Sequence, residues 1–228
     1  MKQMPLLPEL NHEELAVLRK NPLFTGLDWE ELGRMLSAMK AEKTRCERGE
    51  LLQPAGKPVR RFGLVLSGAV QVFVDDIEGN RMIMAEVAPG ASFGESLCFL
   101  RTKESPVYIT AMEDTVLLWL STDALHDDRN NNSELQRRFT AVLAGKTLMM
   151  NNRIQVLSKL SLRGKLTAYF TELAAAQGSN VIRLPMNRED TAAYIGANRS
   201  ALSRELARMK DEGLIEYRKN EITIIHNS

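Results

Sequence analysis

The spacing of apolar residues divides the chain into three regions, and the first, which extends to about residue 45, is helical in pattern. A short helix is predicted over 13–19. A second is predicted over 29–39, where leucines and methionines recur at three- and four-residue spacing. Asp28 precedes this run and Glu31 lies three residues later. The pair predicts an N-terminal capping box.

The second region, from Glu50 to Leu120, has the pattern of short strands separated by glycines. The segment 76–80, which ends in Gly-Asn, predicts a hairpin turn between two alternating strands. Many short strands at nearly regular spacing predict a small antiparallel barrel or jelly roll. The predicted strands cover Leu51–Leu52, 62–66, 69–74, 81–87 and 107–111.

The third region opens with the polar stretch 130–133, after which a long helix is predicted from Glu134 to Leu160. Its apolar residues form two overlapping series, and a helix that is apolar on two sides must bury both. We expect one side to lie on the barrel and the other to pair with a second copy in a coiled coil. The alternative is a single core helix wrapped by one chain. The first series is Leu135, Phe139, Val142, Met149, Val156 and Leu160, and the second is Leu143, Met150, Ile154 and Leu157.

The stretch 187–213 predicts two helices joined by a tight turn. Asn187 and Asn198 can each cap a helix, and Gly196 permits the left-handed backbone of the turn. Ala192 is small enough for two helices to cross closely, and Gly213 is expected to end the second helix. The expected shared core is Ile195, Leu202 and Leu206.

The exposed face of the second helix is predicted to be basic, because four basic residues and one acidic residue lie between Asn198 and Lys210. Arginine near the start of such a helix suits bidentate contact with guanine O6 and N7 in the major groove. Strands predicted over 214–217 and 221–225 form a hairpin whose basic tip can touch phosphate, which gives a winged helix-turn-helix. The alternative is a helical hairpin with solvated charges. The predicted DNA-binding residues are Arg199, Ser200, Ser203, Arg204, Arg208 and Lys219.

The composition is that of an ordinary globular protein, since 44% of the 228 residues are hydrophobic and 26% are charged. Thirty basic and 29 acidic residues leave a net charge of +1, which argues against indiscriminate binding of polyanions. No apolar run approaches the roughly 20 residues of a membrane helix, and the first ten residues do not resemble a secretory signal. We therefore expect a cytoplasmic protein with no membrane partner.

Cysteine and histidine are scarce. The two cysteines, Cys46 and Cys98, form no CxxC pair and cannot supply the four thiolates of an iron–sulfur cluster. The three histidines are scattered, so no metal site is expected within one subunit.

Five features resemble the Crp/Fnr superfamily of bacterial transcription regulators, relatives of the cyclic-AMP receptor protein. They are the segment 21–27 (Asn-Pro-Leu-Phe-Thr-Gly-Leu), the glycine-punctuated barrel, Phe93-Gly94-Glu95, the long helix and the winged helix-turn-helix. The resemblance implies an α+β fold with an effector-sensing jelly-roll domain and N-terminal helices over 1–133. A dimerisation helix over 134–160 and a DNA-binding domain over 161–228 follow.

The resemblance also implies a function. A homodimer would bind a pseudo-palindromic operator, with its recognition helices about 34 Å apart. A small effector would bind between the barrel and the long helix, and RNA polymerase would be a further partner of an activator. The protein would then be a regulator and not an enzyme.

Two departures from the family concern the ligand and the operator. Where relatives that bind cyclic nucleotides carry an Arg-Ser or Arg-Thr pair for the phosphate, this chain has Ser105-Pro106, so cyclic AMP is not the expected effector. The cysteine set of the oxygen-sensing branch is also missing. In the recognition helix Ser200 stands where the family commonly has a glutamate, while Ser203 and Arg204 match the family. A guanine read by Arg204 is expected, and the base preference at Ser200 is open.

The resemblance implies a largely apolar effector pocket with a few polar anchors, which suits an aromatic or other apolar ligand. The alternative is that these residues only fill the barrel core. No cofactor is expected, although haem could use Cys98 or Met150 as an axial ligand. The candidate effector-binding residues are Phe73, Phe93, Glu95, Leu97, Tyr108, Met150 and Asn151.

Two other functions are alternatives to this one. A metal-dependent jelly-roll enzyme would need histidines in the strands, and the barrel stretch has none. A regulator without a ligand could instead sense redox state through Cys46 or Cys98. Lys43, Arg45 and Arg48 surround Cys46 in sequence and would favour its thiolate.

Overall fold

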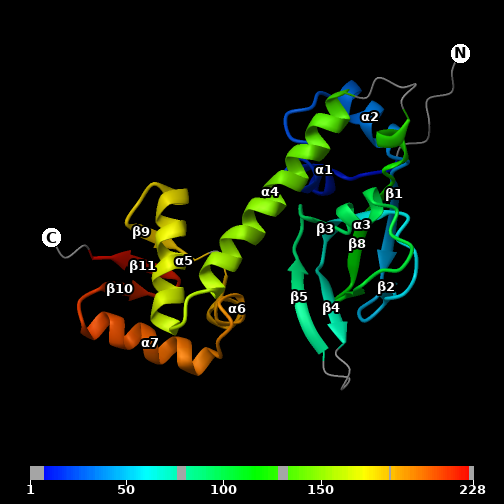
Figure 1. The fold of residues 1–228 in the computed structure, drawn as a ribbon. Coiled ribbons are helices and arrows are strands. Elements are labelled where there is room, and N and C mark those ends of the chain that lie inside the picture. The colour runs from blue at the N-terminus through cyan, green and yellow to red at the C-terminus, as the bar shows by residue number, and fades with distance from the viewer. Residues whose placement is uncertain (1–7, 76–80, 128–132, 185, 226–228) are drawn as a thin grey trace, which may run out of the picture. The chain divides into compact units, whose positions relative to one another are not determined.

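The computed structural model describes residues 8–75, 81–127, 133–184 and 186–225. The chain divides into two compact units, Met1–Ala144 and Gly145–Ser228. Helix α4 (Ser133–Leu157) begins in the first unit and ends in the second, which confirms the long helix predicted from the sequence (Figure 1). The hairpin turn predicted at 76–80 and the polar residues 130–132 lie outside the described residues.

The first unit contains two four-stranded antiparallel sheets, as expected for a jelly roll. Both sheets mix strands that are distant in sequence, so the fold is closed by pairings that no local pattern reveals. One sheet has the order β1 (Glu42–Cys46), β8 (Thr115–Leu120), β3 (Phe62–Ser67) and β6 (Ser92–Phe93). The other has the order β2 (Leu51–Gln53), β7 (Tyr108–Ala111), β4 (Val70–Asp75) and β5 (Arg81–Val87).

The sheet that contains β8 buries both of its faces. Leu117 and Trp119 contribute to an apolar cluster with residues of the other sheet, while Leu118 and Leu120 contribute to a second cluster with the helices. The covering helices supply Leu18, Leu36, Cys98 and Phe139 to that second cluster. They are α1 (His12–Leu18), α2 (Trp29–Ala38), α3 (Glu95–Phe99) and the first part of α4.

Three elements of this unit differ from the sequence prediction. Residues 42–46 form strand β1 and not part of a helical region, because β1 is an edge strand in which only Cys46 is buried. Its charged residues therefore carry no apolar period. The two-residue strand β6 and the five-residue helix α3 are not predicted from the sequence either, since both are too short for a period. Gly94 at φ +81° separates them.

The segment 21–27, one of the five features of the resemblance, is held by a buried asparagine. The Asn21 side chain donates from Nδ2 to the carbonyl of Gly90 at 3.0 Å and to Ser92 Oγ at 3.3 Å. Its Oδ1 accepts the Leu23 amide at 3.0 Å. A buried amide that satisfies both its donor and its acceptor fixes this segment against the strand end at Ser92.

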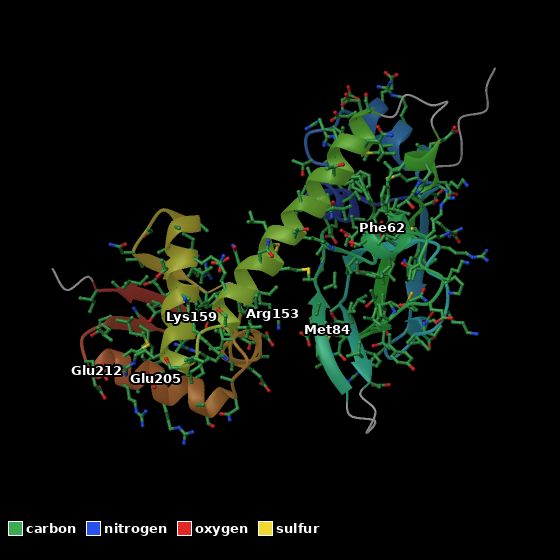
Figure 2. All side chains as sticks on the ribbon, viewed as in Figure 1. Phe62, Met84, Arg153, Lys159, Glu205 and Glu212 are labelled. Atoms are coloured by element: carbon green, nitrogen blue, oxygen red, sulfur yellow. The ribbon has the colours of Figure 1, made fainter. Side chains whose placement is uncertain are left out.

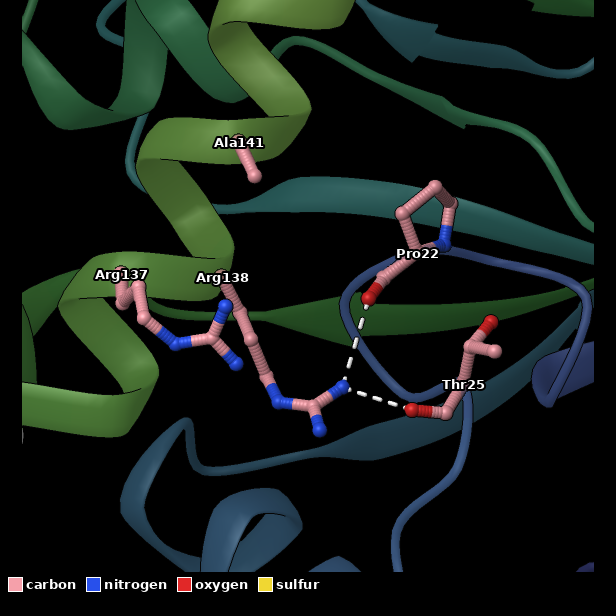
Figure 3. Close-up of a pocket in the computed structure, with 5 residues that line it drawn as sticks. All are labelled: Pro22, Thr25, Arg137, Arg138 and Ala141. Atoms are coloured by element: carbon pink, nitrogen blue, oxygen red, sulfur yellow. Dashed lines mark hydrogen bonds between the residues drawn. The ribbon is translucent and has the colours of Figure 1, made fainter.

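Arg138 of α4 binds the same segment from the other side. Its Nη1 donates to the carbonyl of Thr25 at 2.7 Å and reaches that of Pro22 at 3.5 Å (Figure 3). Its Nε donates to Glu134 at 2.6 Å, and hydrogen bonds from Arg137 and Arg138 lower the pKa of Glu134 to about 2. The first turns of α4 are therefore bonded to the segment 21–27 as well as packed on the core.

The second unit contains the predicted helix-turn-helix and a three-stranded sheet of order β10–β11–β9. Asn187 and Asn198 cap α6 and α7, and Gly196 (φ +67°) has a left-handed backbone in the turn, as predicted. Gly213 (φ +72°) follows the end of α7, which confirms the predicted helix end. Strand β9 pairs with β11, a pairing that the sequence does not predict. The elements are α5 (Leu162–Gln177), β9 (Val181–Arg183), α6 (Arg188–Tyr194), α7 (Arg199–Asp211), β10 (Ile215–Arg218) and β11 (Glu221–Ile224).

We predict that Gly63→Ala destabilises the first unit. A Cβ at Gly63 would lie 2.2 Å from Cζ of the buried Phe93 ring, so the ring would have to move. Overpacking of this kind costs about 1–3 kcal/mol, which urea denaturation followed by circular dichroism will measure. Gly145→Ala is the control: its Cβ would meet no atom within 4 Å, and alanine favours the helix. Equal stability of the two variants would contradict the packing described.

Candidate functional site

Helix α7 has one buried and one exposed side. Leu202, Leu206 and Met209 are buried in the core of the second unit, and the Asn198 side chain caps the first turn by accepting the Ala201 amide at 2.8 Å. Positions on the opposite side are separated by three or four residues and so form one surface. Its exposed residues are Ser200, Ser203, Arg204, Ala207 and Asp211.

Glu205, an acidic residue of α7, is paired with an arginine of another helix. Arg163 of α5 donates from Nε to Glu205 at 2.7 Å, and from both terminal nitrogens to Glu212 at 2.6 and 2.8 Å. Figure 2 labels both glutamates beside α7. These contacts raise the pKa of Arg163 and lower that of Glu212, so both charges persist at neutral pH. Arg163 therefore neutralises the negative charge of Glu205. Arg204 makes no ion pair with any described residue.

An aromatic ring of the β10–β11 hairpin contacts two cations from the neighbouring helices. The Arg188 guanidinium lies 5.1 Å from the centre of the Tyr217 ring, and Lys210 Nζ lies 5.6 Å from it. Arg188 Nη2 also donates to the carbonyl of Lys219, at the tip of the hairpin, at 2.9 Å. Burial lowers the pKa of Arg188 below its ordinary value. The wing turn is therefore held next to the start of α6.

All six residues predicted to bind DNA are exposed and lie in the second unit, on α7 and the wing turn. Arg199 is the first residue of α7, and Arg208 lies 3.6 Å from Glu205. Sequence reasoning missed Arg163 and Arg188, which support the interface from α5 and α6. Arg188 follows the cap Asn187, but only the folded chain places it on Tyr217.

The last turns of α4 are bonded to the helices of this unit. Asn152 Nδ2 donates to Glu172 of α5 at 2.8 Å. The guanidinium of Arg153, which is labelled on α4 in Figure 2, lies 5.2 Å from the centre of the Tyr194 ring of α6. Val156 is buried in the same core as α7. The last turns of α4 are therefore part of the same packed unit as the helix-turn-helix.

The candidate effector residues of the first unit occupy three environments. Phe73 and Tyr108 are register partners on β4 and β7, and their rings stack at 5.2 Å and 15°. Phe93 is packed edge-on against Trp119 within the sandwich, with 5.6 Å between ring centres. Leu97 of α3 packs against the helix-covered core. The structure thus groups Phe73 with Tyr108 and places Phe93 and Leu97 elsewhere.

Glu95 is the first residue of α3 and is buried, with 4% of its surface exposed. It accepts a hydrogen bond from the Ser92 hydroxyl, which in turn accepts one from Asn21. A buried carboxylate held in this way is part of the unit's polar framework as well as a candidate anchor. Met150 and Asn151, the remaining candidates, are exposed and belong to the second unit.

Ser105, which stands where a phosphate-binding arginine is expected in relatives, is used by its own loop. Its hydroxyl donates to the carbonyl of Val107 at 2.8 Å, and its backbone exchanges hydrogen bonds with Lys57 and Gly56 at 2.9 and 2.8 Å. Ser105 is 3% exposed, and the nearby basic residues of the segment 101–103 are exposed. The described contacts of Ser105 therefore supply none of the positive charge that an anionic phosphate requires.

The expectation that basic neighbours favour the thiolate of Cys46 is wrong. Both cysteines are buried, and burial raises the pKa of each thiol above its ordinary value. Lys43 is paired with Glu14 at 2.7 Å instead of facing the sulfur. Cys98, considered above as a haem ligand, lies within the helix-covered core with its Sγ 3.4 Å from Thr122 Oγ1.

Among the described residues, no group of three metal-ligating side chains is close enough to hold an ion. His226 lies outside these residues. No helix in the described ranges has the length and apolar character needed to cross a membrane.

Two protein families match this chain, one over the first unit and one over the second. Residues 43–130 match the cyclic nucleotide-binding domain, and residues 164–227 match the Crp-like helix-turn-helix domain. Among curated relatives, the cyclic AMP receptor protein of Thermus thermophilus is 27% identical over 205 residues, which cover 87% of this chain and 89% of that protein. The anaerobic regulatory protein of Pasteurella multocida is 23% identical over 87% of this chain and 73% of its own length.

Solved structures share the fold. FixK2 of Bradyrhizobium japonicum superposes with a TM-score of 0.55 at 21% identity, over 82% of this chain and 93% of that one. The c-di-GMP-responsive regulator CLP of Xanthomonas campestris superposes with a TM-score of 0.58 at 16% identity, over 88% of this chain and all of that one.

We predict that Arg188→Ala weakens DNA binding through Lys219. Without the guanidinium the wing turn loses its hydrogen bond and ring contact, so each single variant, Arg188→Ala or Lys219→Ala, should lose about 1 kcal/mol of binding free energy, or roughly fivefold in Kd. The double variant should lose little more than either single one, as fluorescence anisotropy with labelled duplex will show. Arg183→Ala, an exposed arginine of β9, controls for charge alone. Additive losses would contradict the coupling.

We also predict that both cysteines are inert in the folded protein. Because burial raises their pKa values, Cys46 and Cys98 should be protonated at about pH 7.5 and react with a maleimide far more slowly than in about 8 M urea, which mass spectrometry will follow. Fast labelling of either thiol in the native protein, or DNA affinity that changes with peroxide, would restore the redox alternative.

Proposed function

The chain belongs to the Crp/Fnr family of transcription regulators, with an effector domain and a DNA-binding helix-turn-helix domain, and on this premise we propose how it works. It acts as a homodimer on a pseudo-palindromic operator and is gated by a small effector other than cyclic AMP. Residues 1–133 sense the effector, 134–160 dimerise and 161–228 read DNA. The observation that carries the proposal is the exposed side of α7, where Arg204 has no ion pair with a described residue, beside a wing turn held in place by Arg188.

The recognition step follows from the chemistry of α7. Arg204 extends from the exposed side of the helix and suits a bidentate contact with guanine O6 and N7 in the major groove. Ser203 and Arg199 lie beside it, and Arg208 follows at the edge. Lys219 at the wing tip contacts phosphate, which positions the helix without reading sequence.

Dimerisation is supported by the second apolar series of α4. Leu143, Met150 and Leu157 repeat every seven residues, and Ile154 lies four after Met150, as in the seam of a coiled coil. Met150 is 65% exposed and Ile154 is 60% exposed in the single chain. Apolar side chains that repeat on one side of a helix and remain exposed are typical of a partner surface. A second copy supplies the same seam by symmetry.

The effector proposal rests on chemistry in the first unit. The stacked pair Phe73 and Tyr108 suits an aromatic or otherwise apolar ligand, and the buried Glu95 offers one polar anchor. The loop has Ser105 in place of the arginine that a cyclic phosphate needs. The contribution of Met150 and Asn151 to the same site stays a prediction. Binding shifts the regulator between two states only as far as the ligand prefers one of them.

We predict that Arg204→Ala removes sequence preference at one base pair of each half-site. The loss should be about 1–3 kcal/mol of discrimination there, because the bidentate contact disappears. Competition between matched and single-substituted duplexes measures it. Arg204→Lys keeps the charge and should retain general affinity with a weaker guanine preference, because lysine lacks the planar fork of the guanidinium. Unchanged discrimination in Arg204→Ala would refute the assignment of α7 as the reading helix.

We predict that Ile154→Glu produces a monomer. A carboxylate in each copy would face its symmetry mate across an apolar seam, and sedimentation equilibrium will report the mass of the species formed. Gln155→Glu adds the same charge to an exposed position away from the seam and should remain dimeric. If both variants have the same mass, the seam lies elsewhere.

A further inference from the structure

The Ser200 hydroxyl has its hydrogen committed within the protein. Asn198 Oδ1 accepts the Ala201 amide at 2.8 Å, which identifies that atom as the oxygen of the side-chain amide, because a backbone N–H needs an acceptor. Ser200 Oγ lies 2.7 Å from the same Oδ1. An amide oxygen cannot donate, so Ser200 donates to Asn198. Its single hydrogen is then unavailable, and its lone pairs remain as acceptors.

The position of Ser200 makes this orientation relevant to recognition. Ser200 is exposed and lies four residues before Arg204, one turn away on the same side of α7. Four residues of helix span about 6 Å, so the two side chains reach base pairs that are close together in one half-site.

We propose that Ser200 is a specificity-determining residue that accepts a hydrogen bond from an exocyclic amino group and so selects amino over keto bases at its position. In the major groove cytosine N4 and adenine N6 are donors, whereas guanine O6 and thymine O4 are acceptors. An acceptor hydroxyl can bond the first pair and not the second. The inference rests on the proposed function, since it requires α7 to enter the major groove.

The predicted grouping of the bases is the same whichever DNA strand Ser200 faces. Adenine and cytosine are the amino bases, and their complements are thymine and guanine, so a preference for amino groups separates A and C from G and T on either strand. A shape-based preference would separate A·T from G·C pairs, and a contact based on ring size would separate purines from pyrimidines. Only the first partition follows from the hydrogen bond to Asn198.

The experiment is selection from a random duplex library with the full-length protein and two variants, followed by binding to four duplexes that differ at one symmetric pair of positions. Ser200→Ala removes the acceptor, and the position whose base frequencies it changes is the one that Ser200 reads. Asn198→Gly removes the group that holds the hydroxyl, and glycine is tolerated at an N-cap, so the helix is kept. Circular dichroism confirms the fold of each variant.

The wild type should favour the two amino duplexes by about 3- to 10-fold over the two keto duplexes, the contribution of one hydrogen bond. Ser200→Ala should bind all four within about twofold while keeping the guanine read by Arg204. Asn198→Gly frees the hydroxyl to donate as well as accept, so the amino preference should largely disappear.

Two results would overturn the inference, and they differ in scope. A wild-type preference at this position that groups purines, or groups A with T, refutes the role of Ser200 and leaves the guanine at Arg204 in place. The absence of any sequence preference, at the Arg204 position too, refutes the proposed function and this inference with it.

Discussion

The burial requirement of α4 governs the rest of the molecule. In the first unit Leu135, Phe139 and Val142 are buried in the core, and Arg138 binds the segment 21–27. The apolar residues at this end of the helix are therefore buried within one chain. Further along, Met150 and Ile154 are largely exposed although they continue an apolar repeat. The apolar residues left exposed on this side of the helix are the ground on which we propose a second copy and a two-fold dimer. The same helix continues into contacts with α5 and α6 of the DNA-binding unit.

The charge of the DNA-reading side of α7 depends on ion pairs made elsewhere in the second unit. Arg163 holds Glu205 and Glu212 from the neighbouring helix, which leaves Arg204 without an acidic partner among the described residues. Tyr217 of the wing contacts Arg188 and Lys210, and Asn198 bonds both the first turn of α7 and the hydroxyl of Ser200. These contacts orient the side chains and the wing turn that the DNA-binding surface presents. Support of this kind is what keeps a recognition geometry rigid.

The sequence predicted the elements whose signals are local and missed those that depend on long-range pairing. The helix caps at Asp28, Asn187 and Asn198 all form as the residue types and spacing predict. Strand β1 was not predicted, because a charged edge strand has no apolar period. The pairing of β9 was not predicted, because its partner β11 comes only after α6, α7 and β10. The thiolate character of Cys46 was inferred from neighbours in sequence, whereas burial controls its pKa. The support given by two arginines of α5 and α6 likewise exists only in the folded chain.

The most direct test of the account is the dependence of affinity on the distance between half-sites. Two half-sites recovered by selection are joined at centre-to-centre spacings that increase in single base pairs, and Kd is measured for each duplex at fixed salt. A two-fold dimer with one recognition helix per copy predicts a sharp optimum at about 10 base pairs, one turn of DNA, and a large loss when about 5 are added. Affinity that does not vary with spacing would contradict the dimeric reading of DNA on which the account depends.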